Sequence, residues 1–320
     1  MASVEEGAEE KAREKAWDKG RAGGRGLVLV AGKLSGRRKS TMRIAVASGK
    51  GGTGKTTIST SLALSAETDV QYLDCDVEEP NGHIFLRPEL THKETCSVTI
   101  PELDPARCNG CGKCRDICRF NAIVQFGQNV MIFPELCHSC LGCFEVCEED
   151  ALLEAEREIG VLESGMAGSI HFVNGHVRIG EAMGVPLLKA VKKKADPEKL
   201  VIIDAPPGTS CPFVETISDV DYVILVTEPT PFGLHDLKLA VTVIKSRAIP
   251  CGVIINRSDL GDDRLISYCE EEKLPVLMEI PFRRKIAEGY ARGQSLVEVI
   301  PDLRKGFQDV LANISLDTVC

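Results

Sequence analysis

The sequence lacks a long apolar run, an excess of basic charge and a secretory signal. No apolar segment approaches the roughly 18 residues that a membrane-spanning helix needs. The formal net charge of −9 argues against sequence-independent nucleic-acid binding, which relies on basic surface. With 43% hydrophobic residues, the 320-residue chain can still bury the core of one large domain and a smaller one. We therefore expect a soluble, cytoplasmic protein with no membrane span and no nucleic-acid partner.

The first 41 residues differ in composition from the rest of the chain. Residues 1–26 are charged, rich in Gly and Ala and nearly free of large apolar side chains, so the extension 1–41 is predicted to be disordered or a frayed helix. The apolar stretch at 27–32 is too short for a secretory signal. Met42 directly precedes the first predicted strand, so the functional chain begins either there or with the tail.

The cysteines are concentrated in one segment. Eight of the fourteen lie between positions 108 and 147. A disulfide framework is implausible in a chain of this size that has no secretory signal. The clustering favours metal or iron–sulfur ligation, and therefore a reducing compartment.

The cysteine segment is an internal repeat. The spacing C-x2-C-x2-C-x3-C occurs twice, and the two copies align without gaps at an offset of 29 residues. Pro105 matches Pro134, and Ala122-Ile123 matches Ala151-Leu152. Two copies of one half-motif predict a module with pseudo-two-fold symmetry.

This spacing favours two 4Fe–4S clusters. Three close thiolates can hold three corners of a cubane, and in two-cluster ferredoxins the fourth cysteine of each run serves the other cluster. Zinc is the alternative, although zinc sites usually join two C-x2-C pairs and do not need a third close cysteine. The predicted sets are Cys108, Cys111, Cys114 and Cys147 for one cluster, and Cys137, Cys140, Cys143 and Cys118 for the other.

Short apolar runs alternate with helix patterns along the rest of the chain. Continuous apolar runs are typical of strands covered on both faces, and alternating strands and helices predict a doubly wound, mostly parallel α/β sheet. The segment 96–155 breaks this alternation, so we interpret it as a small inserted α+β domain within a larger domain of residues 42–95 and 156–320. The strand candidates are 43–48, 70–75, 200–205, 221–227, 251–256 and 275–280.

The segment "SGKGGTGKTT" at 48–57 follows a predicted strand and opens a helix, which is the context that a phosphate-binding P-loop requires. Lys55 would contact the β- and γ-phosphates, and the Thr56 hydroxyl would bind Mg²⁺. The predicted nucleotide-binding residues of the loop are Gly49, Gly51, Gly52, Thr53, Gly54, Lys55, Thr56 and Thr57.

Acidic residues follow two of the predicted strands. Asp204 ends an apolar strand, as the acid that binds Mg²⁺ or its waters does in P-loop enzymes. Asp74 and Asp76 close another strand, and the carboxyl ends of parallel strands meet at the crevice where ligands bind. The alternative for Asp204 and Asp76 is that they only cap strands.

These motifs resemble the deviant Walker A ATPases, the group that contains MinD, ParA, the Mrp-type scaffolds and the nitrogenase iron protein. The resemblance covers residues 43–95 and about 156–320. With its insert, the chain is similar to the MinD-superfamily ATPases that contain an inserted ferredoxin domain. The insert resembles bacterial-type ferredoxins over about 50 residues, but Arg119 and Glu148 stand where that family usually has proline.

The resemblance implies further roles. Lys50 corresponds to the signature lysine that reaches the phosphates of the opposite subunit in a nucleotide-sandwich dimer; the alternative is a solvated surface lysine. Asp76 would position the attacking water, and Gly208 falls in switch II. Asn256 matches an asparagine that contacts adenine, and Pro281 lies in a segment that lines the base.

Two details bear on ligand identity. Arg257 follows Asn256, whereas guanine recognition would want an Asn-Lys pair with a nearby Asp, so ATP is favoured over GTP. Cys211 lies seven residues after Asp204, the offset of a bridging-cluster ligand in the nitrogenase iron protein. A small buried thiol is the simpler interpretation of Cys211.

The sequence therefore predicts a Mg²⁺-dependent P-loop ATPase that couples nucleotide-dependent dimerisation, with itself or with a related ATPase, to its clusters. The coupling would serve electron transfer to a redox partner or cluster delivery to a client protein. One alternative is a MinD/ParA-like positioning ATPase with structural clusters, and another is a ferredoxin with an inactive ATPase fold. A C-terminal amphipathic helix through Leu303, Phe307, Val310 and Leu311 is expected to pack on the sheet and not on a membrane.

Overall fold

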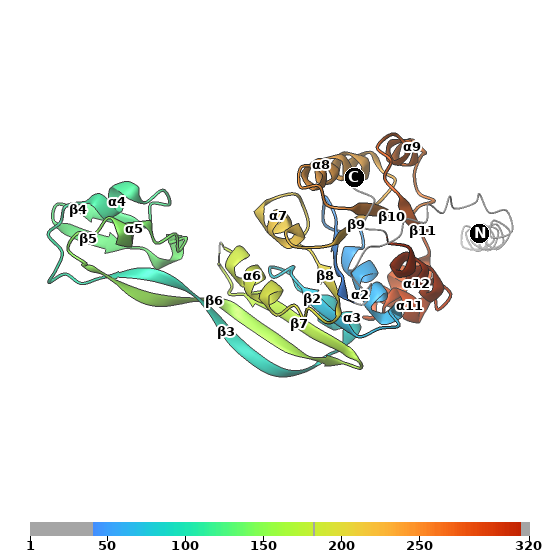
Figure 1. Cartoon of the computed structure of the whole chain (residues 1–320), viewed down its shortest axis with the longest axis horizontal. Helices are drawn as coiled ribbons and strands as arrows, with labels where there is room; N and C mark the ends of the chain where they lie inside the picture. Colours follow the sequence, from blue (N-terminus) through green and yellow to red (C-terminus); the bar gives the residue numbers. More distant parts are fainter. Residues whose placement is uncertain (1–40, 182, 315–320) are drawn as a thin grey trace, which may run out of the picture. The chain divides into compact units, whose positions relative to one another are not determined.

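A nine-stranded sheet organises the chain in the computed structural model, which describes residues 41–181 and 183–314 (Figure 1). The strand order is β11-β10-β9-β1-β8-β2-β7-β6-β3. From β11 to β7 each strand runs parallel to its neighbour, whereas β6 and β3 extend the sheet as antiparallel strands. The strands of this sheet are β1 Arg43–Ala47, β2 Val70–Asp74, β3 Glu89–Leu103, β6 Leu152–Ala167, β7 Ile170–Val177, β8 Leu200–Asp204, β9 Tyr222–Thr227, β10 Cys251–Asn256 and β11 Val276–Ile280.

Helices cover both faces of the sheet and give it two apolar cores. Alternate residues of β1 enter different cores: Ala45 packs with α6, α7, α8 and α9, and Ile44 packs with α2, α11 and α12. This period of two is what a strand buried on both faces requires. The helices are α2 Lys55–Ser65, α3 Gly82–Leu86, α6 Val185–Lys193, α7 Cys211–Ile217, α8 Pro231–Lys245, α9 Arg264–Glu271, α10 Arg284–Ala291, α11 Leu296–Val299 and α12 Leu303–Asn313.

The predicted doubly wound, mostly parallel sheet is confirmed. All six apolar runs form strands within a residue or two of the expected bounds. Strand β7 was not expected, because polar residues such as Asn174 interrupt its apolar run. The long strands β3 and β6 were not expected either, since most of β3 is exposed and its sequence is polar. The predicted N-terminal extension lies, apart from Thr41, outside the described residues.

A small module lies between β3 and β6 and carries the eight clustered cysteines. Its elements are α4 Lys113–Ile117, β4 Ile123–Phe126, β5 Asn129–Ile132, the 3₁₀ turn Pro134–Leu136 and α5 Gly142–Glu145. Strands β4 and β5 pair as a hairpin. Ile123, Val130, Cys143 and Leu152 form a core that is separate from the two cores of the main sheet.

The backbone of this module repeats with the 29-residue offset of the sequence. The amide of Asp104 donates to the carbonyl of Ala151 at 2.8 Å, and the equivalent amide of Phe133 donates to Ala122 at 2.8 Å. Three equivalent pairs have positive φ, a conformation that costs energy in residues other than glycine. These pairs are Gly110 and Ser139, Gly112 and Leu141, and Asn121 and Asp150.

The predicted domain boundaries at 95/96 and 155/156 fall inside strands. Strand β3 pairs with β6 from Glu89 opposite Met166 to Leu103 opposite Leu152. Figure 1 shows the two strands as one ribbon that belongs to the sheet at one end and reaches the module at the other. The division into domains remains a prediction, with its boundaries within this ribbon.

The amphipathic C-terminal helix packs as expected. Leu303, Phe307 and Val310 of α12 are buried in the same core as Ile58 and Leu62 of α2. The apolar face of α12 is therefore covered by the protein itself. Over residues 41–181 and 183–314, no helix has the length and apolar character needed to cross a bilayer.

Replacing Phe307 by alanine tests the importance of this contact. The side chain is 0% exposed, so we expect Phe307→Ala to lower the free energy of unfolding by about 3–5 kcal/mol through lost burial and a residual cavity. Phe232, at 75% exposure, is the matched control, and Phe232→Ala should change stability by less than about 0.5 kcal/mol. Guanidinium unfolding followed by circular dichroism measures both, and equal losses would show that α12 does not anchor this core.

Candidate functional site

The P-loop connects β1 to α2 through a turn that depends on glycine. Gly54 has a φ of 90°, in the region that side chains with a Cβ rarely adopt. A Cβ there would lie 2.5 Å from the side-chain nitrogen of Asn256. That nitrogen donates to the carbonyl of Thr53 at 2.8 Å, so Asn256 fixes the loop from the end of β10. Helix α2 begins directly after this turn, with Lys55 as its first residue.

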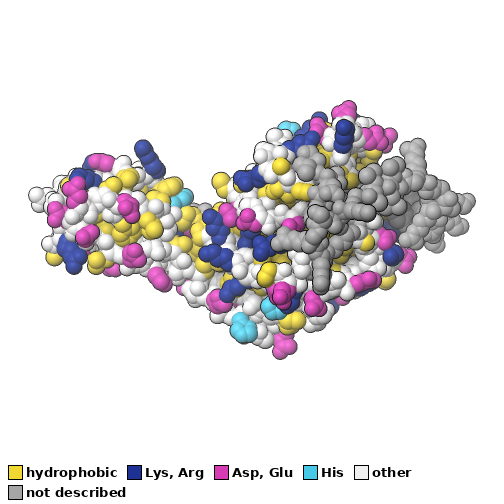
Figure 2. Space-filling model, viewed as in Figure 1, with side chains coloured by type: hydrophobic (Ala, Val, Ile, Leu, Met, Phe, Trp, Pro, Cys, Tyr) yellow, Lys and Arg dark blue, Asp and Glu magenta, His cyan; other side chains and the backbone are white. Residues whose placement is uncertain are grey.

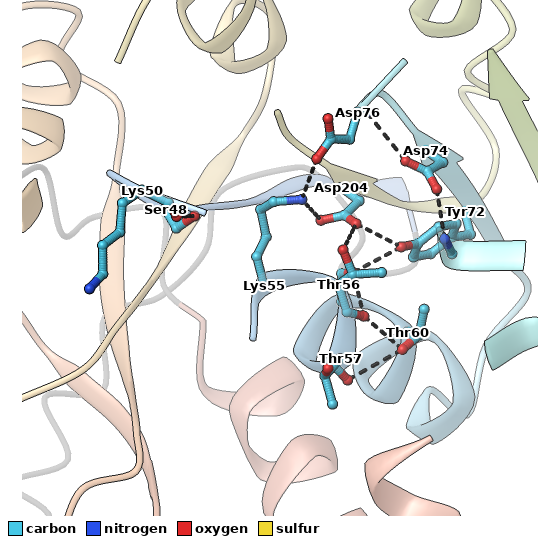
Figure 3. Close-up of polar contacts among 12 residues, drawn as sticks. Ser48, Lys50, Lys55, Thr56, Thr57, Thr60, Tyr72, Asp74, Asp76 and Asp204 are labelled. Atoms are coloured by element: carbon cyan, nitrogen blue, oxygen red, sulfur yellow. Dashed lines mark hydrogen bonds and ion pairs between the residues drawn. The ribbon is translucent and has the colours of Figure 1, made fainter. Parts of the chain in front are cut away.

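Asp204 forms hydrogen bonds with the polar side chains at the end of the loop (Figure 3). Its Oδ1 accepts from Lys55 Nζ at 2.8 Å, and its Oδ2 accepts from the Thr56 hydroxyl at 2.6 Å. The Tyr72 hydroxyl lies 3.2 Å from the same Oδ2. Asp204 is fully buried, and the ammonium of Lys55 lies within hydrogen-bonding distance of it as a compensating charge. Carboxylate and hydroxyl oxygens are ligands that Mg²⁺ prefers, and Thr56 and Asp204 fit that role.

Asp76 completes the environment of Lys55. Lys55 Nζ lies 3.4 Å from Asp76 Oδ2. Burial alone would lower the pKa of Lys55, but Asp204 and Asp76 together raise it, so the amine is charged. Burial raises the pKa of Asp76 to about 6, against the opposing effect of Lys55. The structure thus brings together Lys55, Thr56, Asp76 and Asp204, all predicted site residues.

Asp74 is a buried acid that accepts hydrogen bonds from backbone amides. Its Oδ2 accepts from the amide of Gly82 at 2.8 Å, and its Oδ1 accepts from the amide of Asp76 at 3.2 Å. Burial and the nearby charge of Asp204 raise the pKa of Asp74 to about 8. Asp74 therefore shapes the loop that presents Asp76.

Lys50 does not join this cluster. In Figure 3 its side chain points away from Lys55 and Asp204. Its ammonium lies 4.0 Å from Glu228, which also binds Arg257 at 2.7 Å. The Lys50 side chain remains 34% exposed. The two lysines of the loop therefore have different surroundings, one enclosed and one facing outward.

A cleft of about 400 Å³ opens above the P-loop. Asn256 and Pro281, the two residues expected near the base, line it together with P-loop residues and Asp76. Gly208 does not line this cleft; its amide donates to the carbonyl of Ser48 at 3.1 Å, which ties the segment after β8 to the P-loop. The predicted loop residues that line the cleft are Gly51, Gly52, Gly54, Lys55, Thr56 and Thr57.

The clustered cysteines surround two separate cavities of the small module. In each, three cysteines come from one run and the fourth comes from the other run, and backbone amides approach the sulfur atoms of Cys137 and Cys147 at 3.4 Å and 3.3 Å. One cavity is lined by Cys108, Cys111, Cys114 and Cys147, and the other by Cys118, Cys137, Cys140 and Cys143.

Over the described part of the chain, no three His, Cys, Asp or Glu side chains form a group that could hold one metal ion. A cubane cluster places its thiolates on four different iron atoms around a central volume. Four cysteines lining each cavity match the number of protein ligands that a cubane takes, and the cluster assignment remains a prediction.

The remaining cysteines of interest lie apart from these sets. Cys211 begins α7 and is exposed, so it is not the small buried thiol of the simpler interpretation. Cys75 is fully buried, and Cys96 is partly buried on β3. A role of Cys211 in a bridging cluster remains a prediction.

Comparison with known proteins identifies the large domain. Residues 44–297 match the family of CobQ/CobB/MinD/ParA nucleotide binding domains (CbiA). The chain belongs to this family. The predicted membership of the MinD/ParA group is thereby confirmed, and the subgroup with an inserted ferredoxin domain remains a prediction.

Relatives of this MinD/ParA-type protein include two from Methanocaldococcus jannaschii. The uncharacterized protein MJ0578 is 38% identical over 75% of this chain and 84% of its own length. The uncharacterized ATP-binding protein MJ0547 is 25% identical over 81% of each chain.

Two solved structures share the fold. The cell division ATPase MinD of Pyrococcus furiosus has a TM-score of 0.51 at 18% identity and covers 85% of this chain and 98% of its own. A ParA family ATPase from Chlorobium tepidum has a TM-score of 0.51 at 16% identity, covering 86% of this chain and all of its own.

Several residues of this MinD/ParA-type site were not expected from the sequence. Tyr72 binds Asp204 from the middle of β2, where an apolar strand position gave no functional signal. Glu79 and Asn81 line the cleft from the loop after β2, and Tyr290 lines it from α10. The buried Oδ1 of Asn81 finds no hydrogen-bond partner within the described residues, which marks it as a candidate ligand contact.

The raised pKa of Asp74 predicts a pH dependence of stability. The native protein retains a proton on Asp74 up to about pH 8, whereas an unfolded chain loses it near its ordinary value of 3.8. The native state therefore binds more protons in this window, and the free energy of unfolding should fall as the pH rises. Asp74→Asn should flatten the dependence of the free energy of unfolding on pH between about pH 6 and about pH 8. It should also lower that free energy by about 1 kcal/mol, because one hydrogen-bond acceptor is lost. Urea unfolding of the apoprotein across this range measures the slope, and an unchanged slope in the variant would assign it to another group.

Proposed function

We propose that the protein is a Mg²⁺-dependent ATPase that couples ATP binding, dimerisation and hydrolysis to two 4Fe–4S clusters in its small module. The observation that carries this proposal is the joint presence of two complete sites. A P-loop lysine is paired with Asp204 beneath a nucleotide-sized cleft, and two sets of four cysteines surround two cavities. Membership of the MinD/ParA nucleotide-binding family supports the first part.

ATP is the nucleotide that the site favours. A protein that shares a quarter of its residues with this chain is named as ATP-binding. Asn256 and Pro281 line the cleft and could contact a base, and Arg257 stands where a guanine-specific pair would have lysine. Thr56 and Asp204 would hold Mg²⁺, which neutralises phosphate charge when it is bound.

Within one subunit, Lys55 is the cation that contacts Asp204 and Asp76, and Arg257 and Arg283 also line the cleft. Lys55 would stabilise charge on the β- and γ-phosphates, and Asp76 would accept a hydrogen bond from the attacking water. Water attacks the γ-phosphorus as the bond to the ADP oxygen breaks, which yields ADP and phosphate. Lys50 points away from its own cluster and is available to the site of a second subunit. Hydrolysis would then depend on dimerisation.

The eight cysteines would hold the clusters in the crossed arrangement of the two cavities. When bound, the clusters supply one-electron redox chemistry. The amides near Cys137 and Cys147 would donate to ligand sulfur atoms and so favour their anionic form. The protein would deliver either electrons to a redox partner or clusters to a client.

Positioning on a surface by α12 is a less suitable function. The helix is buried against α2 through Leu303, Phe307 and Val310, which leaves no apolar face for a lipid surface. A ferredoxin with an inactive ATPase fold also fits poorly, because Lys55, Thr56 and Asp204 form an intact hydrogen-bonded set.

The role of Lys50 is tested by its replacement with alanine. Lys50→Ala should leave the nucleotide affinity of the monomer unchanged, since Lys50 makes no contact with Lys55 or Asp204 in the described structure. It should lower the rate of ATP hydrolysis at least about a hundredfold, because a cation that stabilises transition-state charge is lost. Nucleotide titration and steady-state phosphate release measure the two effects. A variant with full hydrolysis would make Lys50 an ordinary surface lysine.

The crossed cysteine sets are tested with two double variants. Cys118→Ala with Cys137→Ala removes two ligands of the same set, so about four irons per chain should remain after anaerobic reconstitution. Cys118→Ala with Cys108→Ala takes one ligand from each set, so both clusters should be lost or become labile. The reverse pattern would show that each run holds its own cluster.

The coupling itself is tested in the unmodified chain. Iron and acid-labile sulfide are counted after anaerobic reconstitution, and ATP hydrolysis is compared between oxidised and reduced protein. About eight irons with a redox-dependent rate is the expected result. Eight irons with the same rate of ATP hydrolysis in oxidised and reduced protein would favour structural clusters. Bound zinc in place of iron would contradict the cluster assignment.

A further inference from the structure

A buried ion pair lies where the β3–β6 ribbon meets the cysteine-rich module. Arg157 of β6 donates through both terminal nitrogens to Glu181, Nη1 to Oε2 and Nη2 to Oε1, the latter at 3.3 Å. The Arg157 side chain is 6% exposed, and the Glu181 side chain is 1% exposed. A bidentate pair at this depth moves as a unit, because separating it would leave a buried charge without compensation.

One end of this pair touches the second cysteine set. Arg157 Nη2 lies 3.5 Å from the carbonyl oxygen of Cys137. The same loop is fixed to β3 by the Ser139 hydroxyl, which donates to the carbonyl of Thr99 at 2.6 Å. Arg157 Nε is buried and finds no hydrogen-bond partner among the described residues. Glu181 and Cys137 therefore determine where this cation lies.

The other end of the pair leads to the nucleotide site. The amide of Glu181 donates to the carbonyl of Arg178 at 2.9 Å, and the amide of Val177, next to Arg178, donates to the carbonyl of Val77 at 3.1 Å. Val77 directly follows Asp76, which lies 3.4 Å from Lys55. The chain of contacts between the phosphate-binding lysine and Cys137 is thus continuous.

Close packing makes this connection stiff. A Cβ added to Gly184 would lie 3.1 Å from a methyl group of Val77, and one added to Gly175 would lie 3.0 Å from the other. The amide of Met183 donates to Glu181 Oε1 at 3.1 Å. Val77 therefore packs closely against Gly175 and Gly184, which lie on either side of Glu181 in the sequence.

We propose that the Arg157–Glu181 pair couples the nucleotide site to the second cysteine set. The inference rests on the proposed function and names the contact through which that coupling runs. When the loop of Asp76 engages a nucleotide, Val77 and Val177 move together and Glu181 repositions the Arg157 cation beside Cys137. The charge of a cluster held there would respond to that cation. By thermodynamic reciprocity, reduction of this cluster must change nucleotide affinity by the same factor that the nucleotide changes reduction.

The test measures the affinity of the full-length, reconstituted protein for Mg²⁺–AMPPNP in the oxidised and in the dithionite-reduced state. In the wild type we expect the two dissociation constants to differ by at least about fivefold. Glu181→Gln should bring this ratio close to one while the iron content is retained. The double variant Arg157→Met with Glu181→Met removes both charges, avoids a stranded ion and should give the same result. Lys194→Met, which breaks the exposed Lys194–Glu94 pair between α6 and β3, is the matched control and should keep the wild-type ratio.

Each outcome decides the inference. A wild-type ratio that persists in both Glu181 variants overturns the coupling role of the pair. A wild-type ratio of one, with nucleotide bound and eight irons present, overturns the inference and leaves the proposed ATP and cluster binding intact. Failure to bind nucleotide or iron overturns the proposed function itself, and the inference with it.

Discussion

The buried carboxylate of Asp204 is the interaction on which the site depends. It ends β8 in the middle of the sheet, and it binds Lys55, Thr56 and Tyr72 from two other elements. An uncompensated carboxylate at this depth would be strongly unfavourable, so the ammonium of Lys55 is held over the sheet before any phosphate arrives. The P-loop thus starts from an organised state. A phosphate would compete with Asp204 and Asp76 for Lys55, which links occupancy of the cleft directly to the loop that Asp76 begins.

Two lysines that are five residues apart in sequence, Lys50 and Lys55, have opposite roles in this fold. Lys55 is enclosed and neutralises buried acids, whereas Lys50 is partly exposed and pairs with Glu228 at the rim. Glu228 is also paired with Arg257 at 2.7 Å, so withdrawal of Lys50 would not leave that buried carboxylate without a cation. The same loop therefore carries one lysine held among buried acids and one that is partly exposed.

Local sequence was sufficient to predict many of the strands and the P-loop residues. Continuous apolar runs located six strands, and the P-loop pattern placed Lys55 and Thr56 at the start of a helix. Local sequence was insufficient to predict contacts between segments that lie far apart in the chain. Nothing near Tyr72 indicates that its hydroxyl meets an acid 132 positions away. Strand β7 contains Asn174 within an apolar run, and β3 is largely an exposed edge, so neither shows the period of a buried strand.

Because Leu103 and Leu152 are register partners, the sheet meets the whole cysteine-rich module as if it were the turn of a β-hairpin. Both chain connections of residues 104–151 enter and leave side by side, and the module has its own small core. Such a loop can be lengthened, exchanged or shortened to a two-residue turn without altering the order of the strands. The arrangement explains in topological terms how one nucleotide-binding scaffold can carry, or dispense with, an entire cysteine-rich unit.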